Sequence, residues 1–211
     1  MIAEHVEVVT PPASADLMAL ATVKTRLGIT GTASDVALTG AISLASALIA
    51  GECRRALGAQ TIAETFRIRP AGLVNAREID RQALSLSYTD ATVTGVTVDG
   101  ESADPATYES SGGMVRCVTA SGTRTTWPGC VIVVTYSAGY TLPSGAPPVL
   151  AEYCLALVTA SHRGQADRSP GVKSETADGI GSVTYFDRGA GAMVIDDAMR
   201  AGLQPFRVLV V

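Results

Sequence analysis

The sequence has few histidines and aromatic residues and no excess of positive charge. It contains two histidines and one tryptophan in 211 residues, and its four cysteines show no C-x-x-C or Cys/His spacing for zinc. The formal net charge of −4 argues against sequence-independent binding of nucleic acid, which needs clustered Lys and Arg. No run of about 18 apolar residues occurs, and a basic-then-apolar signal pattern is lacking at the N-terminus, so we expect no membrane span.

The cysteines lie far apart, each inside an apolar helix or strand pattern. Cys53, Cys117, Cys130 and Cys154 are therefore predicted to be reduced core thiols of a protein made in the cytoplasm. The length and a mean hydropathy of +0.27 suffice for one core, or one core plus a small lobe.

Residues 127–164 are predicted to form a buried strand and a long helix on which the remainder of the chain packs. The β-branched run at 130–136 predicts a strand buried on both faces. Pro147 and Pro148 suit the first turn of a helix, where an amide donor is not needed. The following apolar residues repeat at helical spacing and should face the core: Val149, Tyr153, Ala156, Leu157 and Ala160.

The residues before this stretch change from a helical to an alternating pattern. Ser14 or Asp16 is expected to cap a helix that ends at Gly28, and a second helix should run from the Ser34-Asp35 cap to Leu57-Gly58. Strands are then expected at residues 61–68, 83–88, 92–98, 108–110 and 114–119, with hairpin turns at Asp99-Gly100 and Gly112-Gly113.

The C-terminal region combines a long polar loop with an apolar end. Residues 165–192 are rich in Gly, Ser, Asp and Thr, with one strand expected at 182–186 and a short helix at 195–203 after it. The last eight residues carry five large apolar side chains, which forgo about 7–15 kcal/mol if left in water. This arm is therefore expected to dock, on its own body or on a neighbour by strand addition.

These patterns together predict an α+β fold with a mainly helical body. The body would comprise a helix hairpin in residues 1–58 and, in 141–211, a long third helix, a short C-terminal helix and an extended docking arm. A small antiparallel β unit at 59–140 would be inserted between them.

No catalytic centre, metal site or cofactor site stands out. His162-Arg163 suits the end of a helix, where cations complement the dipole. Ser137 follows Tyr136 without the first glycine of a nucleophile elbow, and Asp196-Asp197 is best interpreted as an acidic helix start. Arg54-Arg55 at the end of the second helix most simply complements the helix dipole on a solvated face, although it could contact a carboxylate of a partner. We therefore expect no enzyme activity.

The ordered motifs resemble the head–tail connector, or adaptor, proteins of tailed bacteriophages and gene transfer agents. The similarity begins with Ala19-x-x-x-Val23-Lys24-x-x-Leu27-Gly28-Ile29. It continues through Asp35-x-x-Leu38, Ala41-Ile42-x-x-Ala45-x-x-x-Ile49 and Cys53-Arg54-Arg55-x-Leu57, then Val93-x-x-Val96-x-Val98-Asp99-Gly100, Trp127-Pro128, Ala138-Gly139-Tyr140 and Leu203-x-Pro205-Phe206-Arg207. His162 departs from the pattern, since members often have an aromatic residue at that position.

The resemblance implies a non-enzymatic virion neck protein without a cofactor. Copies of it, commonly twelve, would form a ring beneath the portal and extend the DNA channel. DNA would pass through this channel without sequence-specific binding. The ring would also give a platform for the next neck protein, a stopper or tail terminator. The arm (Pro205, Phe206, Arg207, Val208, Leu209 and Val210) would then bind the portal or a neighbour. Contacts between subunits or with the next ring are expected at Arg54, Arg55, Tyr185 and Phe186.

Three alternatives remain. Within a phage neck, a head-closure or tail-completion protein is the nearest. A small serine hydrolase would use Ser137, His162 and a carboxylate. A monomeric module that binds a glycan or peptide would need an exposed aromatic platform, yet the sequence has one Trp and three Phe.

Overall fold

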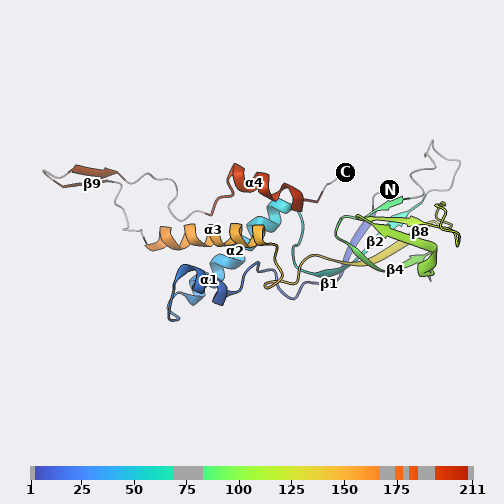
Figure 1. Ribbon diagram of the computed structural model, residues 1–211, viewed down its shortest axis with the longest axis horizontal. Helices are drawn as coiled ribbons and strands as arrows, with labels where there is room; N and C mark the ends of the chain where they lie inside the picture. The colour runs from blue at the N-terminus through green and yellow to red at the C-terminus, as the bar shows by residue number, and fades with distance from the viewer. Residues whose placement is uncertain (1–2, 69–82, 167–173, 178–180, 185–192, 209–211) are drawn as a thin grey trace. The chain divides into compact units, whose positions relative to one another are not determined.

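The protein forms two compact units, each built from segments that are separated in the sequence. The computed structural model describes residues 3–68, 83–166, 174–177, 181–184 and 193–208. The β unit comprises the described parts of 1–14, 54–141 and 207–211, and the helical unit those of 15–53 and 142–206 (Figure 1). Each unit is described on its own.

A five-stranded antiparallel sheet forms the larger part of the β unit. Its strand order is β1-β2-β8-β4-β5, so the late strand β8 lies in the centre. The strands are β1 (His5–Thr10), β2 (Gln60–Arg67), β4 (Thr92–Val98), β5 (Glu101–Ser102) and β8 (Val131–Ala138). Along β8, Ile132, Val134, Tyr136 and Ala138 are buried while the residues between them are half-buried or exposed. The expected burial on both faces is wrong, because only one face of β8 points at the core.

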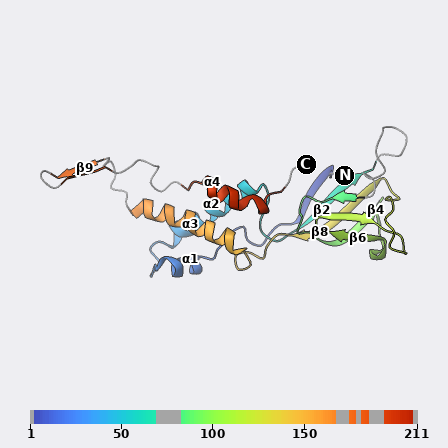
Figure 2. The ribbon, with the colours of Figure 1, turned by 45° about the horizontal axis from the view of Figure 1, so that its top comes forward.

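A second sheet, of three strands, completes the core of the β unit. Its order is β3-β7-β6, with β3 (Ala83–Ser85), β6 (Tyr108–Ser111) and β7 (Met114–Cys117). A 3₁₀ turn, η2 (Pro105–Thr107), precedes β6. Buried side chains of both sheets form one cluster, among them Phe66 and Ile132 from the first and Leu84 and Val115 from the second. Figure 2 shows strands of both sheets.

The two predicted hairpin turns of the β unit are confirmed. Asp99 and Gly100 have φ of 52° and 90° between β4 and β5, and Gly112 and Gly113 have φ of 56° and 74° between β6 and β7. Two consecutive residues with positive φ match the right-handed twist of paired strands. The Asp99 carboxylate also accepts hydrogen bonds from the backbone N–H groups of Cys130 and Val131, so the turn is tied to the start of β8.

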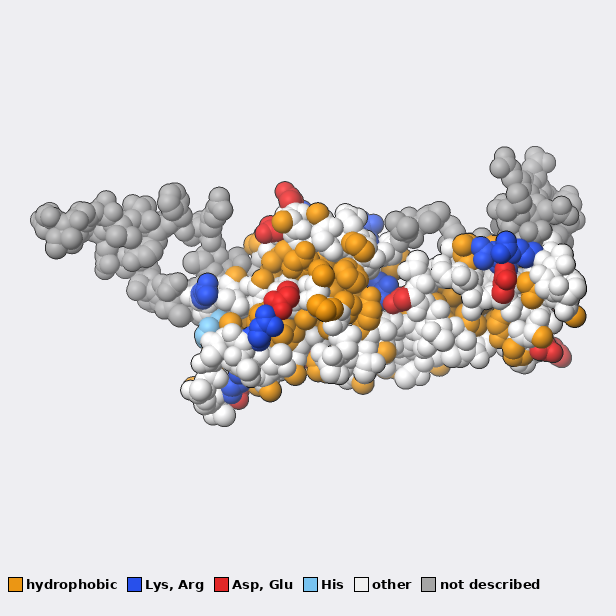
Figure 3. All heavy atoms as spheres, in the orientation of Figure 1, with side chains coloured by type: hydrophobic (Ala, Val, Ile, Leu, Met, Phe, Trp, Pro, Cys, Tyr) orange, Lys and Arg blue, Asp and Glu red, His pale blue; other side chains and the backbone are white. Residues whose placement is uncertain are grey.

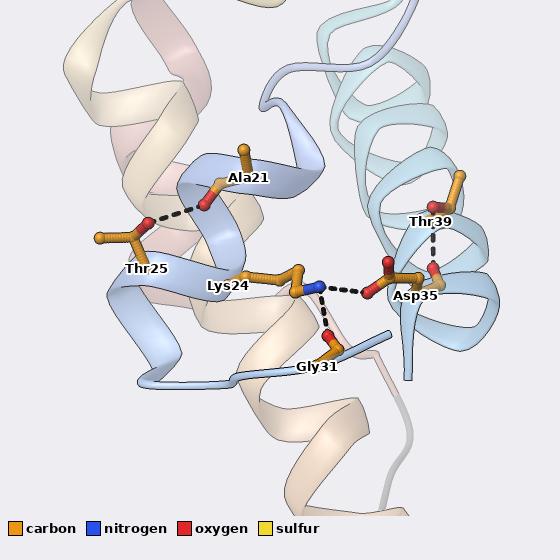
Figure 4. A network of polar contacts seen from close by, with 6 residues as sticks. All are labelled: Ala21, Lys24, Thr25, Gly31, Asp35 and Thr39. Carbon is orange, nitrogen blue, oxygen red and sulfur yellow. Dashed lines mark hydrogen bonds and ion pairs between the residues drawn. The ribbon is translucent and has the colours of Figure 1, made fainter. Parts of the chain in front are cut away.

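The helical unit starts with two consecutive helices, as predicted. α1 (Leu20–Leu27) ends at Gly28, whose φ of 67° is left-handed, and α2 (Asp35–Cys53) follows. The predicted end of the second helix at Leu57-Gly58 is wrong: α2 ends at Cys53, because Arg54 has a left-handed φ of 54°. The Lys24 ammonium bridges the connection, donating to the Gly31 carbonyl at 2.5 Å and to Asp35 at 2.6 Å (Figure 4). The predicted cap at Ser14 or Asp16 is wrong: the helix begins later, after Ala19, whose side chain makes no capping hydrogen bond.

Two further helices and a hairpin complete the helical unit. α3 (Pro148–Ala166) begins at the second of the two prolines, as predicted. The pair β9 (Ser174–Ala177) and β10 (Gly181–Thr184) precedes α4 (Asp197–Leu203) and η3 (Gln204–Phe206). Asp196 caps α4, accepting from the Met199 N–H at 2.7 Å. The acidic helix start is thereby confirmed.

The prediction of a mainly helical body is wrong, although the α+β class holds. The described residues contain four α-helices, but also eight strands in two antiparallel sheets and the β9–β10 hairpin. One reason for the greater strand content is at the N-terminus, where residues 5–10 pair with β2 from His5↔Thr65 to Thr10↔Thr61. An exposed, partly polar segment of this kind carries little strand signal until its partner strand is known.

α2 is long and apolar enough to cross a membrane, judged by length and composition alone. Core helices of water-soluble proteins pass the same test. One face of α2 is buried within the helical unit, through Leu38, Ile42, Ala45, Ile49 and Cys53. The Leu17 N–H donates to the hydroxyl of Ser46 on this face at 2.9 Å.

Candidate docking surfaces

The described part of the C-terminal arm is partly covered. Leu203 is fully buried at the end of α4, and Pro205 is exposed in the turn η3 that follows. Phe206, Arg207 and Val208 are half-buried. Leu209 and Val210 lie outside the described residues, so docking of the arm stays a prediction.

The predicted contacts in the long loop also fall outside the described residues. Tyr185 and Phe186 follow directly on β10, which ends at Thr184. The strand expected at 182–186 therefore starts one residue earlier, and its described part pairs with β9 from Gly181↔Ala177 to Thr184↔Ser174.

Arg54 and Arg55 follow α2 but have different environments. Arg54 is exposed and has a φ of 54°, a left-handed conformation that costs a non-glycine residue free energy. The side chain of Arg55 is only 5% exposed. Its guanidinium donates to both carboxylate oxygens of Asp90, at 3.1 and 2.8 Å, and lies over the rings of Tyr88 (4.6 Å) and Tyr140 (5.8 Å). Arg55 thus makes these contacts within the β unit, directly after the end of α2. The inter-subunit role expected for both arginines stays a prediction.

Buried polar side chains continue inward from Arg55. The amide of Gln60 donates to the Tyr88 hydroxyl at 2.9 Å. The Tyr136 hydroxyl donates to Glu64 at 2.5 Å, and the Ser87 N–H donates to the same carboxylate at 3.0 Å. Burial, and then the hydrogen bond to Glu64, raise the pKa of Tyr136 far above its ordinary value. A tyrosine held in its protonated form supplies a donor to a fully buried carboxylate, so these groups stabilise the fold.

The residues of the alternative serine hydrolase belong to different units. Ser137 is exposed on β8, between Thr61 of β2 and Thr92 of β4, whereas His162 lies on α3. Among the described residues no hydrogen bond joins Ser137 to a histidine or a carboxylate. A nucleophile needs such a base within about 3 Å, and nothing in the described part of the β unit supplies it.

The helical unit exposes apolar side chains on two helices. On α2, Val36 is 88% and Leu44 53% exposed, and on α3, Val149 is 44% exposed. A shallow groove of about 370 Å³ follows α3 and is lined by Glu152, Leu155, Ala156, Thr159, Ala160 and Arg163. Figure 3 shows hydrophobic side chains gathered over this unit. Apolar surface of this kind is typical of contacts between proteins.

The β unit exposes a strand that the sequence patterns missed. All six residues of β1 are exposed, with Val6 at 47%, Val8 at 49% and Val9 at 55%. Alternation of Val6, Glu7 and Val8 was the available signal, but the segment was too short and too close to the prolines at 11 and 12 to stand out.

Solved structures with a similar fold are chains of gene transfer agent (GTA) particles. No protein-family model matches the sequence, and no curated protein is similar to it by sequence. The chain aligns over 98% of its length with a chain in the neck of an empty GTA particle computed with C6 symmetry, at 19% identity, a TM-score of 0.54 and 97% coverage of that chain. The chain is also similar, over 98% of its length, to a chain in the virion of a native GTA particle, at 17% identity, a TM-score of 0.55 and 96% coverage of that chain. A chain in the neck of a native GTA particle computed with C12 symmetry is similar over the same share of this chain, at 17% identity, a TM-score of 0.54 and 97% coverage of that chain. At this identity the likeness establishes a shared fold.

Proposed function

We propose that the protein is a structural subunit of a virion neck, a head–tail connector of a tailed phage or gene transfer agent. Twelve copies would form a ring beneath the portal, extend the DNA channel and give the next neck protein its docking platform. The observation that carries the proposal is coverage: the fold matches chains from GTA particles, two of them neck reconstructions, over 98% of this chain and 96–97% of theirs. Because both units are included in the match, it is not the similarity of one common domain.

The surface properties support an assembly role. The apolar side chains on α2 and α3 and the open strand β1 are surfaces that a subunit covers when it assembles. The net charge of −4 suits the wall of a DNA conduit, because a strongly basic wall would bind the passing polyanion.

Each candidate docking residue has a proposed role. The arm at 205–210 binds the portal or a neighbouring subunit, and Arg54, Tyr185 and Phe186 contact an adjacent subunit or the next ring. Arg55 orients the chain next to Arg54 through its bond to Asp90. The protein works within the particle without catalysis, a cofactor or a membrane.

The mass of the purified protein in solution tests the proposal, alone and after mixing with the portal protein encoded beside it. A complex of about twelve 21.6-kDa subunits, formed alone or on the portal, is the expected result. A chain that stays monomeric and ignores the portal contradicts it, and binding to another neck protein instead would favour a head-closure or tail-completion role.

The role of the arm is tested by truncation. A chain ending at Gln204 is expected to lose incorporation into particles, and a chain ending at Val208 separates the contribution of the last three residues. Unchanged fluorescence of the single Trp127, which is 2% exposed in the β unit, controls for folding. Normal incorporation of the Gln204 truncation would refute the assignment of the arm.

A further inference from the structure

The five-stranded sheet has two open edges. At one end, β1 pairs with β2 and with no other strand among the residues that the structure describes. At the other end, β5 has two residues and pairs with only Thr97 and Val98 of β4. Within the described residues, the first half of β4, at 92–95, is thus paired on one side only, with β8. Unpaired strand edges offer rows of N–H and C=O groups to another strand.

The directions of these two edge strands are complementary. Every neighbouring pair in the sheet is antiparallel, so β1 and β4 run in opposite directions. If a second copy keeps the same strand direction, its β1 lies antiparallel to the open edge of β4 in the first copy. Antiparallel pairing is the more stable arrangement per residue.

The two faces of the edge strands match as well. Val6 and Val8 pair with Glu64 and Ile62, two buried residues, so these valines lie on the core-facing side of the sheet. On β4, Val93 pairs with the buried Tyr136 and is on the same side.

Glu7 and Thr92 lie on the opposite, outer side of the sheet. Glu7 pairs with Ala63 and Thr92 with Ser137, and the side chain of Ser137 is exposed. Joining the edges would therefore place valine beside valine and polar beside polar.

We propose that β1 of one copy adds to the open edge of β4 in the next copy, so that the sheets of adjacent subunits continue into one another. The inference rests on the proposed ring. A contact between two different edges of the same sheet is heterologous, and heterologous contacts close into rings when the rotation between subunits fits. It also covers Val6 and Val8, which nothing within the described chain buries.

Disulfide trapping between copies tests this contact. In a Cys130→Ser background, which removes the exposed native thiol, chains with Glu7→Cys and chains with Thr92→Cys are mixed, assembled and oxidised. Because both positions are on the outer side, we expect cross-linked dimers on a non-reducing gel. Val8→Cys mixed with Thr92→Cys is the matched control, and should give about tenfold less dimer because the two side chains point to opposite sides. His5→Cys is run beside Glu7→Cys to allow for a register shift of two residues.

A charge substitution gives a second, independent readout. Val6→Lys places an ammonium at the joint and should reduce ring formation about tenfold. Met114→Lys, at an exposed apolar position on β7 outside the joint, should leave ring formation unchanged.

The outcomes separate this inference from the proposed function. If rings form without same-side cross-links, or form normally with Val6→Lys, the proposed contact between β1 and β4 is wrong and the proposed ring still holds. Cross-linking of Glu7→Cys to Val208→Cys instead would place the C-terminal arm on β1 and also overturn it. Absence of any ring, alone or with the portal, would refute both proposals.

Discussion

Replacing Gly139 by alanine should destabilise the β unit through a clash between backbones. Gly139 has a φ of 97°, and a Cβ atom there would lie 2.5 Å from the carbonyl oxygen of Gly58 and 2.8 Å from its carbon. The two segments are held together by hydrogen bonds from Ala59 N–H to the Tyr140 carbonyl and from Tyr140 N–H to the Leu57 carbonyl, both 2.8 Å. Since the obstacle is backbone, a change of side-chain rotamer cannot relieve it.

The size of the effect follows from two costs. A positive φ costs an L-residue about 1–2 kcal/mol, and overpacking a close contact costs about 1–3 kcal/mol. Gly139→Ala should therefore lower the free energy of unfolding by about 2–5 kcal/mol. Gly122→Ala is the matched control: its φ is 78°, but nothing lies within 4 Å of the new Cβ. It should lose about 1–2 kcal/mol.

Urea unfolding followed by tryptophan fluorescence measures both variants. Trp127 is the sole tryptophan and belongs to the β unit, so its signal reports that unit, while circular dichroism at 222 nm follows mostly the helices. With a slope of about 1–3 kcal/mol/M, the expected loss moves the midpoint by about 1 M or more. Equal losses for Gly139→Ala and Gly122→Ala would refute the clash argument.

Three further results are expected. A double-mutant cycle of Arg55→Ala and Asp90→Ala should give a coupling of about 1–2 kcal/mol in urea unfolding of the unassembled chain, whereas a value near zero would leave Arg55 without this structural role. Because burial and Glu64 raise the pKa of Tyr136, the unfolded tyrosine loses its proton first above pH 10. The free energy of unfolding should then fall by about 1.4 kcal/mol per pH unit, with a shallower slope for Tyr136→Phe; equal slopes would contradict the linkage. A thiol reagent at pH 8 should modify one cysteine in the native protein, and Cys130→Ser should abolish that reaction; rapid modification of a second thiol would be inconsistent with the burial of the others.

The hairpin turns and the glycine that ends α1 were the most predictable part of the fold. Asp99-Gly100 and Gly112-Gly113 stand where the chain needs positive φ, and Gly28 ends α1 in the left-handed conformation. These requirements involve neighbouring residues only, so sequence alone carries them. Burial of Cys130 was wrongly predicted, because it precedes β8 and is exposed while the other three cysteines are buried.

Features that depend on distant partners were missed. β1 becomes a strand by pairing with β2, more than fifty residues later, and the mainly helical body was predicted because that pairing and the second sheet were not visible. The bond of Arg55 to Asp90, 35 residues away, has no local signature. The interface contact expected for Arg55 stays a prediction. The candidate docking residues at 185, 186, 209 and 210 lie beyond the described residues and stay predictions.

The central position of β8 also governs the order in which the protein can fold during synthesis. β2 and β4 have no neighbour in common until residues 131–138 leave the ribosome, and β1 has nothing but β2 to pair with until then. α2 likewise waits for α3, which begins at residue 148. About two thirds of the chain must therefore be made before either core can close, and such non-local pairing is intrinsically slow. A nascent chain of this protein therefore carries the apolar helix α2 without α3 from residue 53 until residues 148–166 are made.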